Sequence, residues 1–172
     1  MSPPLVIRKA LPQDIADISR LHAHVFGPGR FARSAYRVRE GKGHLSRYCL
    51  VAHLAGQLVA SLRMTEITIG GRAGAALLGP VAVDPEHRGL GLGTKLMKEA
   101  LAAARAGGTS LVVLVGDVPY YGRFGFTAVP PGQIAFPGPV NPARILACEL
   151  EDGATAKYHG MVTAIPSNAV SG

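Results

Sequence analysis

Residues 78–93 read Leu78-Gly79-Pro80-Val81-Ala82-Val83-Asp84-Pro85-Glu86-His87-Arg88-Gly89-Leu90-Gly91-Leu92-Gly93. An apolar run at residues 75–83 predicts a strand, and apolar positions that recur at helical spacing over residues 92–104 predict a helix. Glycines at three alternate positions between these elements allow a tight turn in which backbone N–H groups converge. The sequence therefore predicts an anion-binding turn between a strand and a helix.

Two basic residues flank this turn, and two common nucleotide-binding patterns do not fit it. Arg88 and Lys95 add full charges beside the positive end of the helix dipole. A nucleoside-triphosphate loop needs Gly-Lys followed by Ser or Thr, but Gly93 is followed by Thr94 and then Lys95. A dinucleotide-binding fingerprint also fails, because the sixth position counted from Gly89 is Thr94 and not glycine. Taken alone, the turn could also be a glycine-rich turn with no ligand.

The chain upstream of the turn predicts strands and one well-marked helix. Strands are expected at residues 5–9, 48–54 and 57–69, where apolar and β-branched residues are dense. The apolar face of the helix is expected to consist of Ile15, Ile18, Leu21 and Val25. Pro12 suits its first turn, Gly27 ends it, and a basic helical piece is expected at residues 31–40.

Glycine and proline punctuate the rest of the predicted sheet. Gly79-Pro80 interrupts the strand at residues 75–83, and because proline cannot donate to the ladder, a bulge or local splay is expected there. Further strands are expected at residues 110–115 and 145–150. Proline and glycine crowd residues 130–142, which predicts a loop that either covers a site or simply connects two strands.

Two short segments complete the predicted order of elements. Asp117 is expected to cap a short helix that Gly125 ends. Residues 167–172 are expected to be a frayed tail.

The composition predicts a single domain. With 172 residues, of which 48% are hydrophobic, the chain has the size and apolar content for one core. No apolar run approaches the roughly 18 residues that a membrane span needs, and the first residues do not resemble a secretory signal, so we expect a cytoplasmic protein. Cys49 and Cys148 lie in separate apolar runs, which predicts buried core residues and no metal site.

The net charge of +7 favours an anionic partner, which could be nucleic acid, a membrane surface or a phosphorylated small molecule. The basic residues form no dense run. Aromatic residues make up 6% of the chain, with no Trp, and are therefore poor material for stacking on single-stranded bases. A phosphate-rich cofactor fits the charge at least as well.

Two motifs resemble the GNAT superfamily of acyl-CoA-dependent N-acetyltransferases. The family signature is Arg or Gln, two residues, Gly, one residue, and then Gly or Ala, which residues 88–93 match fully. Tyr121, followed after three residues by Gly125-Phe126, resembles a second family motif at the family's separation from the first. Together the matching segments span about residues 77–129, whereas residues before about 70 fit the family's order of elements only loosely.

The resemblance implies a mixed α/β fold, with a central mixed, mostly antiparallel sheet of about six to seven strands flanked by helices. Residues 1–172 would form one N-acetyltransferase domain with its cofactor-binding core at about residues 75–129. The implied cosubstrate is acetyl-CoA, with no metal, and the acceptor is a primary amine of a small molecule, peptide or protein. No membrane or nucleic-acid partner is expected, and a homodimer is compatible with the family.

The resemblance also implies direct attack of the amine on the thioester in a ternary complex, since neither cysteine is near the motifs in sequence. The backbone N–H near Val81 would stabilise the developing oxyanion. The residues expected to contact the cofactor are Val81, Ala82, Val83, Arg88, Gly89, Leu90, Gly91, Leu92, Gly93 and Thr94. The alternatives are transfer of a longer acyl group and a non-catalytic module that binds acyl-CoA or nucleic acid.

Two residues are candidates for proton transfer. Tyr121 is where the family commonly places the acid that protonates the departing thiolate, although the same ring could simply pack the short helix on the sheet. Glu66 is the candidate general base. The alternative is that Glu66 is simply an exposed strand residue and that water removes the ammonium proton. In this family the acceptor pocket would involve residues 27–44 and 130–141, and nothing in them names the acceptor.

Overall fold

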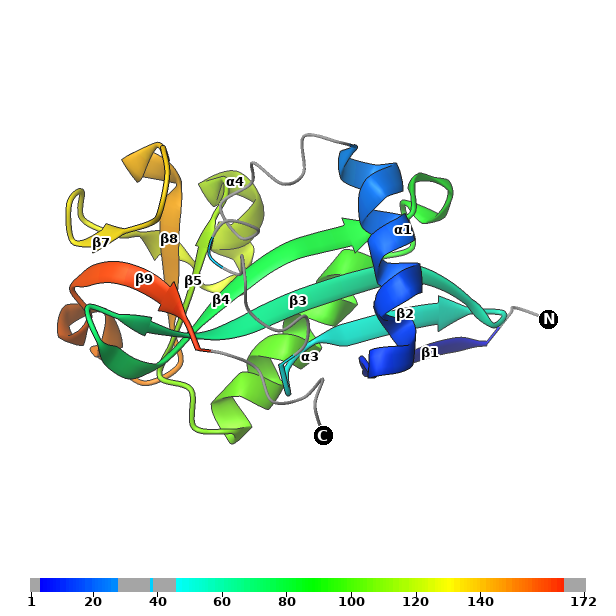
Figure 1. Cartoon of the computed structure of the whole chain (residues 1–172), viewed down its shortest axis with the longest axis horizontal. Coiled ribbons are helices and arrows are strands. Elements are labelled where there is room, and N and C mark those ends of the chain that lie inside the picture. Colours follow the sequence, from blue (N-terminus) through cyan, green and yellow to red (C-terminus); the bar gives the residue numbers. More distant parts are fainter. Residues whose placement is uncertain (1–3, 28–37, 39–45, 166–172) are drawn as a thin grey trace.

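A computed structural model describes residues 4–27, 38 and 46–165 of the chain, and these residues form a sheet with helices on both faces (Figure 1). The strands are β1 (Leu5–Lys9), β2 (Leu50–Leu54), β3 (Gln57–Ile69), β4 (Arg72–Val83), β5 (Leu111–Val115), β6 (Thr127–Ala128), β7 (Ile134–Ala135), β8 (Ile145–Glu149) and β9 (Gly160–Ala164). The α-helices are α1 (Ile15–Phe26), α3 (Leu92–Ala106) and α4 (Val118–Tyr121). Short 3₁₀ helices lie at Pro12–Asp14, Pro85–His87, Gly122–Phe124, Pro142–Arg144 and Ala154–Lys157.

The predicted fold class is confirmed. The main path of the sheet is β1-β2-β3-β4-β5-β8-β6, which is seven strands. Off this path, β9 pairs with β3, and β7 pairs with β9. The β4–β5 and β7–β9 pairs are parallel, and all other pairs of described strands are antiparallel. The predicted strands at 5–9 and 57–69 have the bounds of β1 and β3, and the predicted helix ends at Gly27.

The two long helices pack on opposite faces of the sheet, as Figure 1 shows. On one face Ile18 of α1 packs with Cys49 and Val51. On the other face Leu96 and Ala100 of α3 pack in a larger cluster with alternate residues of the central strands. Side chains alternate between the two faces of a strand. Each apolar strand in the centre of the sheet therefore contributes residues to the core under α1 and to the core under α3.

A bulge interrupts β4 where the sequence predicts one. Leu62 of β3 pairs with Val81, but Met64, two residues further, pairs with Leu78, so β4 carries one extra residue between these pairs. Gly79-Pro80 occupies this position, and its peptide bond is cis. The extra residue offsets the last part of β4 from its register with β3.

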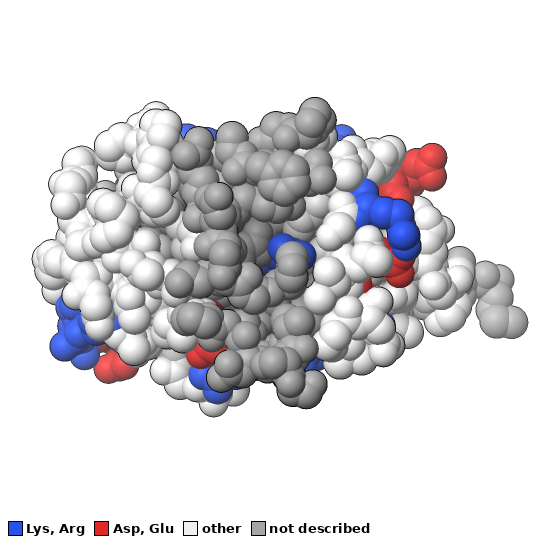
Figure 2. Space-filling view, in the orientation of Figure 1, with Lys and Arg blue, Asp and Glu red and all other residues white. Residues whose placement is uncertain are grey.

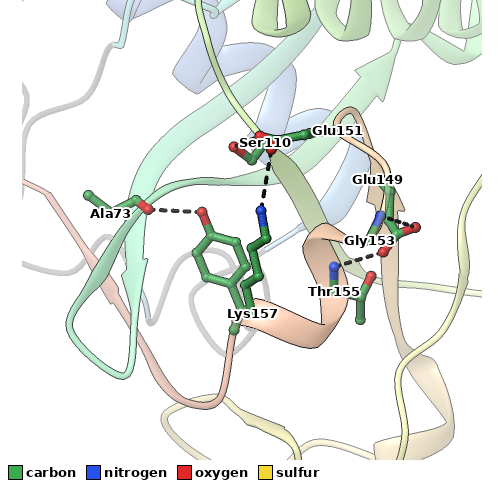
Figure 3. Close-up of polar contacts among 8 residues, drawn as sticks. Ala73, Ser110, Glu149, Glu151, Gly153, Thr155 and Lys157 are labelled. Atoms are coloured by element: carbon green, nitrogen blue, oxygen red, sulfur yellow. Dashed lines mark hydrogen bonds and ion pairs between the residues drawn. The ribbon is translucent and has the colours of Figure 1, made fainter.

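The segment after β8 pairs back onto the sheet, which the sequence does not predict. β9 pairs with the end of β3, at Ile67–Ile69, and β7 lies inside the proline-rich loop and pairs with β9. Figure 3 shows the polar contacts that fasten this segment. Tyr158 donates a hydrogen bond of 2.9 Å to the carbonyl of Ala73, and Lys157 lies 3.3 Å from the carboxylate of Glu151.

Three predictions fall wholly or largely outside the described residues: the tail at 167–172, the basic piece at 31–40 apart from Val38, and the acceptor segment at 27–44 apart from Gly27 and Val38. The side chain of Val38 is buried and packs in the cluster that contains Ile67 and Leu77. None of the helices in the described ranges is long and apolar enough to cross a bilayer.

An ion pair joins β1 to the start of α1. The Arg8 guanidinium donates to both carboxylate oxygens of Asp14, at 2.8 and 2.9 Å, and Asp14 also accepts the N–H of Leu11 at 2.8 Å. The side chain of Asp14 is 5% exposed. Hydrogen bonding from Arg8 holds the pKa of Asp14 below its usual range.

We expect Asp14→Asn to lower the free energy of unfolding at neutral pH by about 2 kcal/mol, because charge-assisted hydrogen bonds of a buried carboxylate are lost. Because the pKa of folded Asp14 is lowered, this stability is complete above the unfolded pKa near 4 and is lost as the pH falls through the folded value. Urea unfolding at a series of pH values should therefore show a smaller acid loss in the variant. Asp17→Asn, which removes the exposed pair with Arg20, is the control and should cost less than about 1 kcal/mol.

Candidate active site

The glycine-rich turn forms an open cradle at the N-terminus of α3. Gly89 and Gly91 have φ values of 85° and 72°, and Gly91 is the N-cap of the helix. A Cβ added at either glycine would meet no atom of the described chain within 4 Å. No side chain in the described ranges caps α3, and the first turn of the helix contains no acidic residue. The first N–H groups of α3 therefore have no intrahelical acceptor and are available to an anion.

Three cations surround this cradle. Arg88 directly follows the 3₁₀ helix that leads into the turn, and Lys95 lies near the start of α3. Nη2 of Arg123 is 3.5 Å from Oγ1 of Thr94 in the first turn of α3. Within the part of the chain that the structure describes, none of the three forms an ion pair. Their charge is therefore available to a negatively charged ligand.

On the face shown in Figure 2, the Lys and Arg side chains of the described residues are scattered, and several of them lie beside Asp or Glu. The described residues form no continuous basic patch on this face.

The parallel strands β4 and β5 separate next to the cradle. They pair only from Ala75 to Leu77, opposite Leu111 to Val113. β4 continues to Val83 on the β3 side, and β5 continues to Val115 on the β8 side. From Leu78 onward, the edge of β4 that faces β5 has no partner among the described strands. This open edge includes Val81–Val83, which the family resemblance implies as cofactor contacts.

Tyr121 lies at the end of β5, beside the opening between β4 and β5. Its ring packs against the backbone of Gly116, where a Cβ would collide with it, and it contacts the edge of Phe126 at a centroid distance of 6.0 Å. The side chain is half-buried on the core that α3 covers. The structure thus brings Tyr121 to the same end of the sheet as the cradle.

Glu66 lies at a different level of the sheet. It pairs with Ala76, in the part of β4 that is still paired with β5, and its carboxylate is 3.1 Å from Nη2 of Arg47. The same Arg47 nitrogen lies 3.4 Å from the carbonyl oxygen of Gly107 at the end of α3. Glu66 is therefore near the C-terminal end of α3, whereas the cradle is at its N-terminal end.

The structure corrects the expected role of Asp117. Asp117 occupies the N-cap position of α4, but its side chain makes no capping hydrogen bond. Its carboxylate is instead 3.2 Å from Nε of Arg144, which leads into β8. The short helix is held by the backbone carbonyl of Asp117, which accepts the N–H groups of Tyr120 and Tyr121.

Cys148 is closer to the second motif than its position in the sequence indicates. Its sulfur is 3.7 Å from the carbonyl oxygen of Phe124, and it lies below Gly125. Burial raises the pKa of the Cys148 thiol, and the residue is 6% exposed. A buried thiol with a raised pKa is a poor nucleophile, so its proximity gives no reason to expect a covalent acyl-enzyme.

A group of polar residues is buried on the face of β3 that α1 covers. Nε2 of His22 lies 3.3 Å from Oγ of Ser61, and both residues are buried. Arg63 and Thr65 follow Ser61 on the same face of β3 and are also buried. Helical spacing could have found His22, because it lies four residues after Ile18 and so shares its face. In the described ranges, no group of three His, Cys, Asp or Glu side chains could hold a metal ion.

The chain is similar in sequence and in fold to known proteins. Residues 6–129 match the family model of the GNAT acetyltransferase domain. The chain is 28% identical over 148 residues to the uncharacterized N-acetyltransferase YjhQ of Escherichia coli K12, which covers 84% of this chain and 81% of that protein. It is 30% identical over 126 residues to the uncharacterized N-acetyltransferase YhbS of the same strain, which covers 71% of this chain and 73% of that protein.

Solved structures share the whole arrangement. The structure of YhbS from Escherichia coli in complex with CoA matches with a TM-score of 0.80 and 26% identity, over 100% of this chain and 94% of that one. A GNAT family acetyltransferase from Brucella melitensis in complex with acetyl-CoA matches with a TM-score of 0.63 and 34% identity, over 84% and 95%. The fold and the site define a GNAT-type acyltransferase domain. The chain belongs to the GNAT acetyltransferase family.

Proposed function

We propose that this protein transfers an acetyl group from acetyl-CoA to a primary amine of a small molecule, peptide or protein, by direct attack in a ternary complex. One observation carries the proposal: the open, uncapped cradle of α3 adjoins the unpaired edge of β4, and Tyr121 lies at the same opening. The CoA and acetyl-CoA bound to two related proteins support the choice of cosubstrate.

The main chain would supply most of the cofactor contacts. Backbone N–H groups from Arg88 to Thr94 would bind the pyrophosphate, because they combine free donors with the positive end of the α3 dipole. Val81–Val83 would pair with the amide-bearing pantetheine arm as a neighbouring strand would. The bulge at Gly79-Pro80 interrupts the pairing with β3 just before this edge, and the pairing of β4 with β5 ends at Leu77, so the β5 side of the edge would have room for the thioester.

The chemistry needs one electrophile and two proton transfers. The amine nitrogen attacks the thioester carbonyl carbon, and the N–H near Val81 stabilises the negative charge that develops on the carbonyl oxygen. The C–S bond then breaks, and Tyr121 donates its hydroxyl proton to the departing thiolate. A phenol has a pKa near 10, whereas a thiol has a pKa near 8.5, so proton transfer from Tyr121 to the thiolate is unfavourable in water. It requires that the site stabilise the transfer.

Glu66 is the proposed acceptor of the ammonium proton, with a water chain as the alternative. Its side chain is 37% exposed and paired with Arg47, and it lies away from the opening between β4 and β5. A proton from the acceptor amine would therefore reach Glu66 only through water.

Steady-state kinetics separate these two routes. If Glu66 is the base, Glu66→Gln should lower kcat/KM by about 10²-fold. Arg47→Gln serves as the matched control, since it breaks the same ion pair and leaves the carboxylate in place. A loss of less than about threefold in Glu66→Gln, or an equal loss in both variants, would exclude Glu66 as the base.

The function itself is tested by the release of CoA thiol. Acetyl-CoA is incubated with a panel of amines, peptides and proteins, and we expect at least one to raise thiol release far above the hydrolysis measured without an acceptor. Binding of acetyl-CoA with no stimulation by any acceptor would favour the non-catalytic alternative. Faster release from a longer acyl-CoA with the same acceptor would assign the enzyme to that acyl group instead.

A further inference from the structure

Arg123 is held beside the cradle by two aromatic rings. Its guanidinium carbon is 4.4 Å from the ring centroid of Tyr120 and 5.0 Å from that of Phe124. The two rings contact each other edge to face at 5.9 Å. A guanidinium stacked on aromatic faces loses little hydration and is restricted in direction. The two rings therefore fix the position of the Arg123 guanidinium, although the residue is exposed.

The position of this charge is fixed relative to α3. A Cβ on Gly93 would lie 3.2 Å from the hydroxyl of Tyr120, so α4 rests directly on the first turn of α3. Nη2 of Arg123 also reaches Oγ1 of Thr94, at 3.5 Å. The guanidinium thus adjoins the helix end whose N–H groups are uncapped.

Arg123 has no acidic partner in the part of the chain that the structure describes. The acid that begins α4, Asp117, is bound by Arg144 instead. An arginine held in a defined direction next to free N–H donors, with no protein carboxylate to bind, suits a phosphate, because its parallel N–H groups match two phosphate oxygens.

We propose that Arg123 binds a phosphate of the acyl-CoA and is a specificity-determining residue of the cofactor site. This inference rests on the proposed function, because it requires an acyl-CoA in the cradle. CoA carries a pyrophosphate and a 3′-phosphate, and either group supplies the same oxygen chemistry. Tyr120 and Phe124 act as positioning residues that hold the guanidinium.

Titration calorimetry on the full chain tests this inference with acetyl-CoA and with 3′-dephospho-CoA. We expect Arg123→Gln to weaken acetyl-CoA binding by about tenfold, as expected for one charge-assisted contact, and Arg123→Lys to lose less. The control is Arg105→Gln, which changes the net charge equally but lies near the C-terminal end of α3, about 18 Å along that helix from Gly93 at 1.5 Å per residue. Its affinity should equal that of the wild type.

The two ligands and the salt dependence define the outcomes. A loss that persists with 3′-dephospho-CoA assigns Arg123 to the pyrophosphate, and a loss that vanishes assigns it to the 3′-phosphate; both support the inference. The deficit should shrink as the ionic strength is raised, because the contact is electrostatic. Unchanged affinity in Arg123→Gln, or an equal deficit at low and high salt, would overturn the role of Arg123. Wild-type binding of acetyl-CoA in the same titrations would leave the proposed function standing.

Discussion

Tyr121→Phe is expected to lower the turnover of acetyl transfer by about 10²-fold or more and to leave the Kd for acetyl-CoA unchanged. The substitution removes only the hydroxyl. The ring packs on Gly116 and against Phe126, and phenylalanine keeps these contacts, so α4 and the cofactor cradle should stay in place. Loss of a proton donor that acts only in the transition state affects kcat and not ground-state binding.

Steady-state kinetics and calorimetry on the same preparation measure the two quantities. Tyr158→Phe is a suitable control, because it also removes a tyrosine hydroxyl, one that donates to the carbonyl of Ala73 in the C-terminal segment. This variant should lose stability of about 1 kcal/mol and no turnover per folded molecule. If Tyr121→Phe turns over as fast as the wild type, Tyr121 only packs α4 on the sheet, and another group protonates the thiolate.

The sequence is most informative where local patterns carry the structure. Alternating glycines between an apolar strand and an apolar helical face predict the cradle. The N–H groups that bind an anion belong to the turn and to the first turn of the helix, so the prediction needs no distant residue. The bulge at Gly79-Pro80 is equally local, since proline cannot donate to a strand ladder. Helix α1 and its end at Gly27 can both be predicted from the sequence, because the apolar spacing and the terminating glycine are local signals.

Predictions weaken where the structure depends on distant partners. β9 has no strong pattern of its own, and it forms because the end of β3 offers an unpaired edge and Tyr158 and Lys157 anchor it. Asp117 has the ideal residue type for a cap, but Arg144 binds its carboxylate in the folded protein. The contact of Arg123 with Thr94 joins residues 29 positions apart, and no local spacing predicts it.

The second large effect is expected from Gly91→Leu, which should weaken acetyl-CoA binding by about 10²-fold. Gly91 has φ 72° and ψ 22°, a left-handed conformation that costs a residue with a Cβ about 1–2 kcal/mol. Among the described residues, no atom lies within 4 Å of the added Cβ, so the variant should fold. The side chain would instead enter the space in which a phosphate approaches the backbone.

Gly153→Leu separates the two contributions. Gly153 is also an N-cap glycine, at Ala154–Lys157, with φ 79°, ψ 5° and no atom within 4 Å of a Cβ, but it lies in the C-terminal segment. Both variants should therefore lose a similar few degrees of Tm, because they carry the same backbone strain. Only Gly91→Leu should lose affinity for acetyl-CoA in titration calorimetry. Equal affinity in the two variants would show that the phosphate does not approach the backbone at Gly91, and the cradle would then have to be assigned to another ligand or to none.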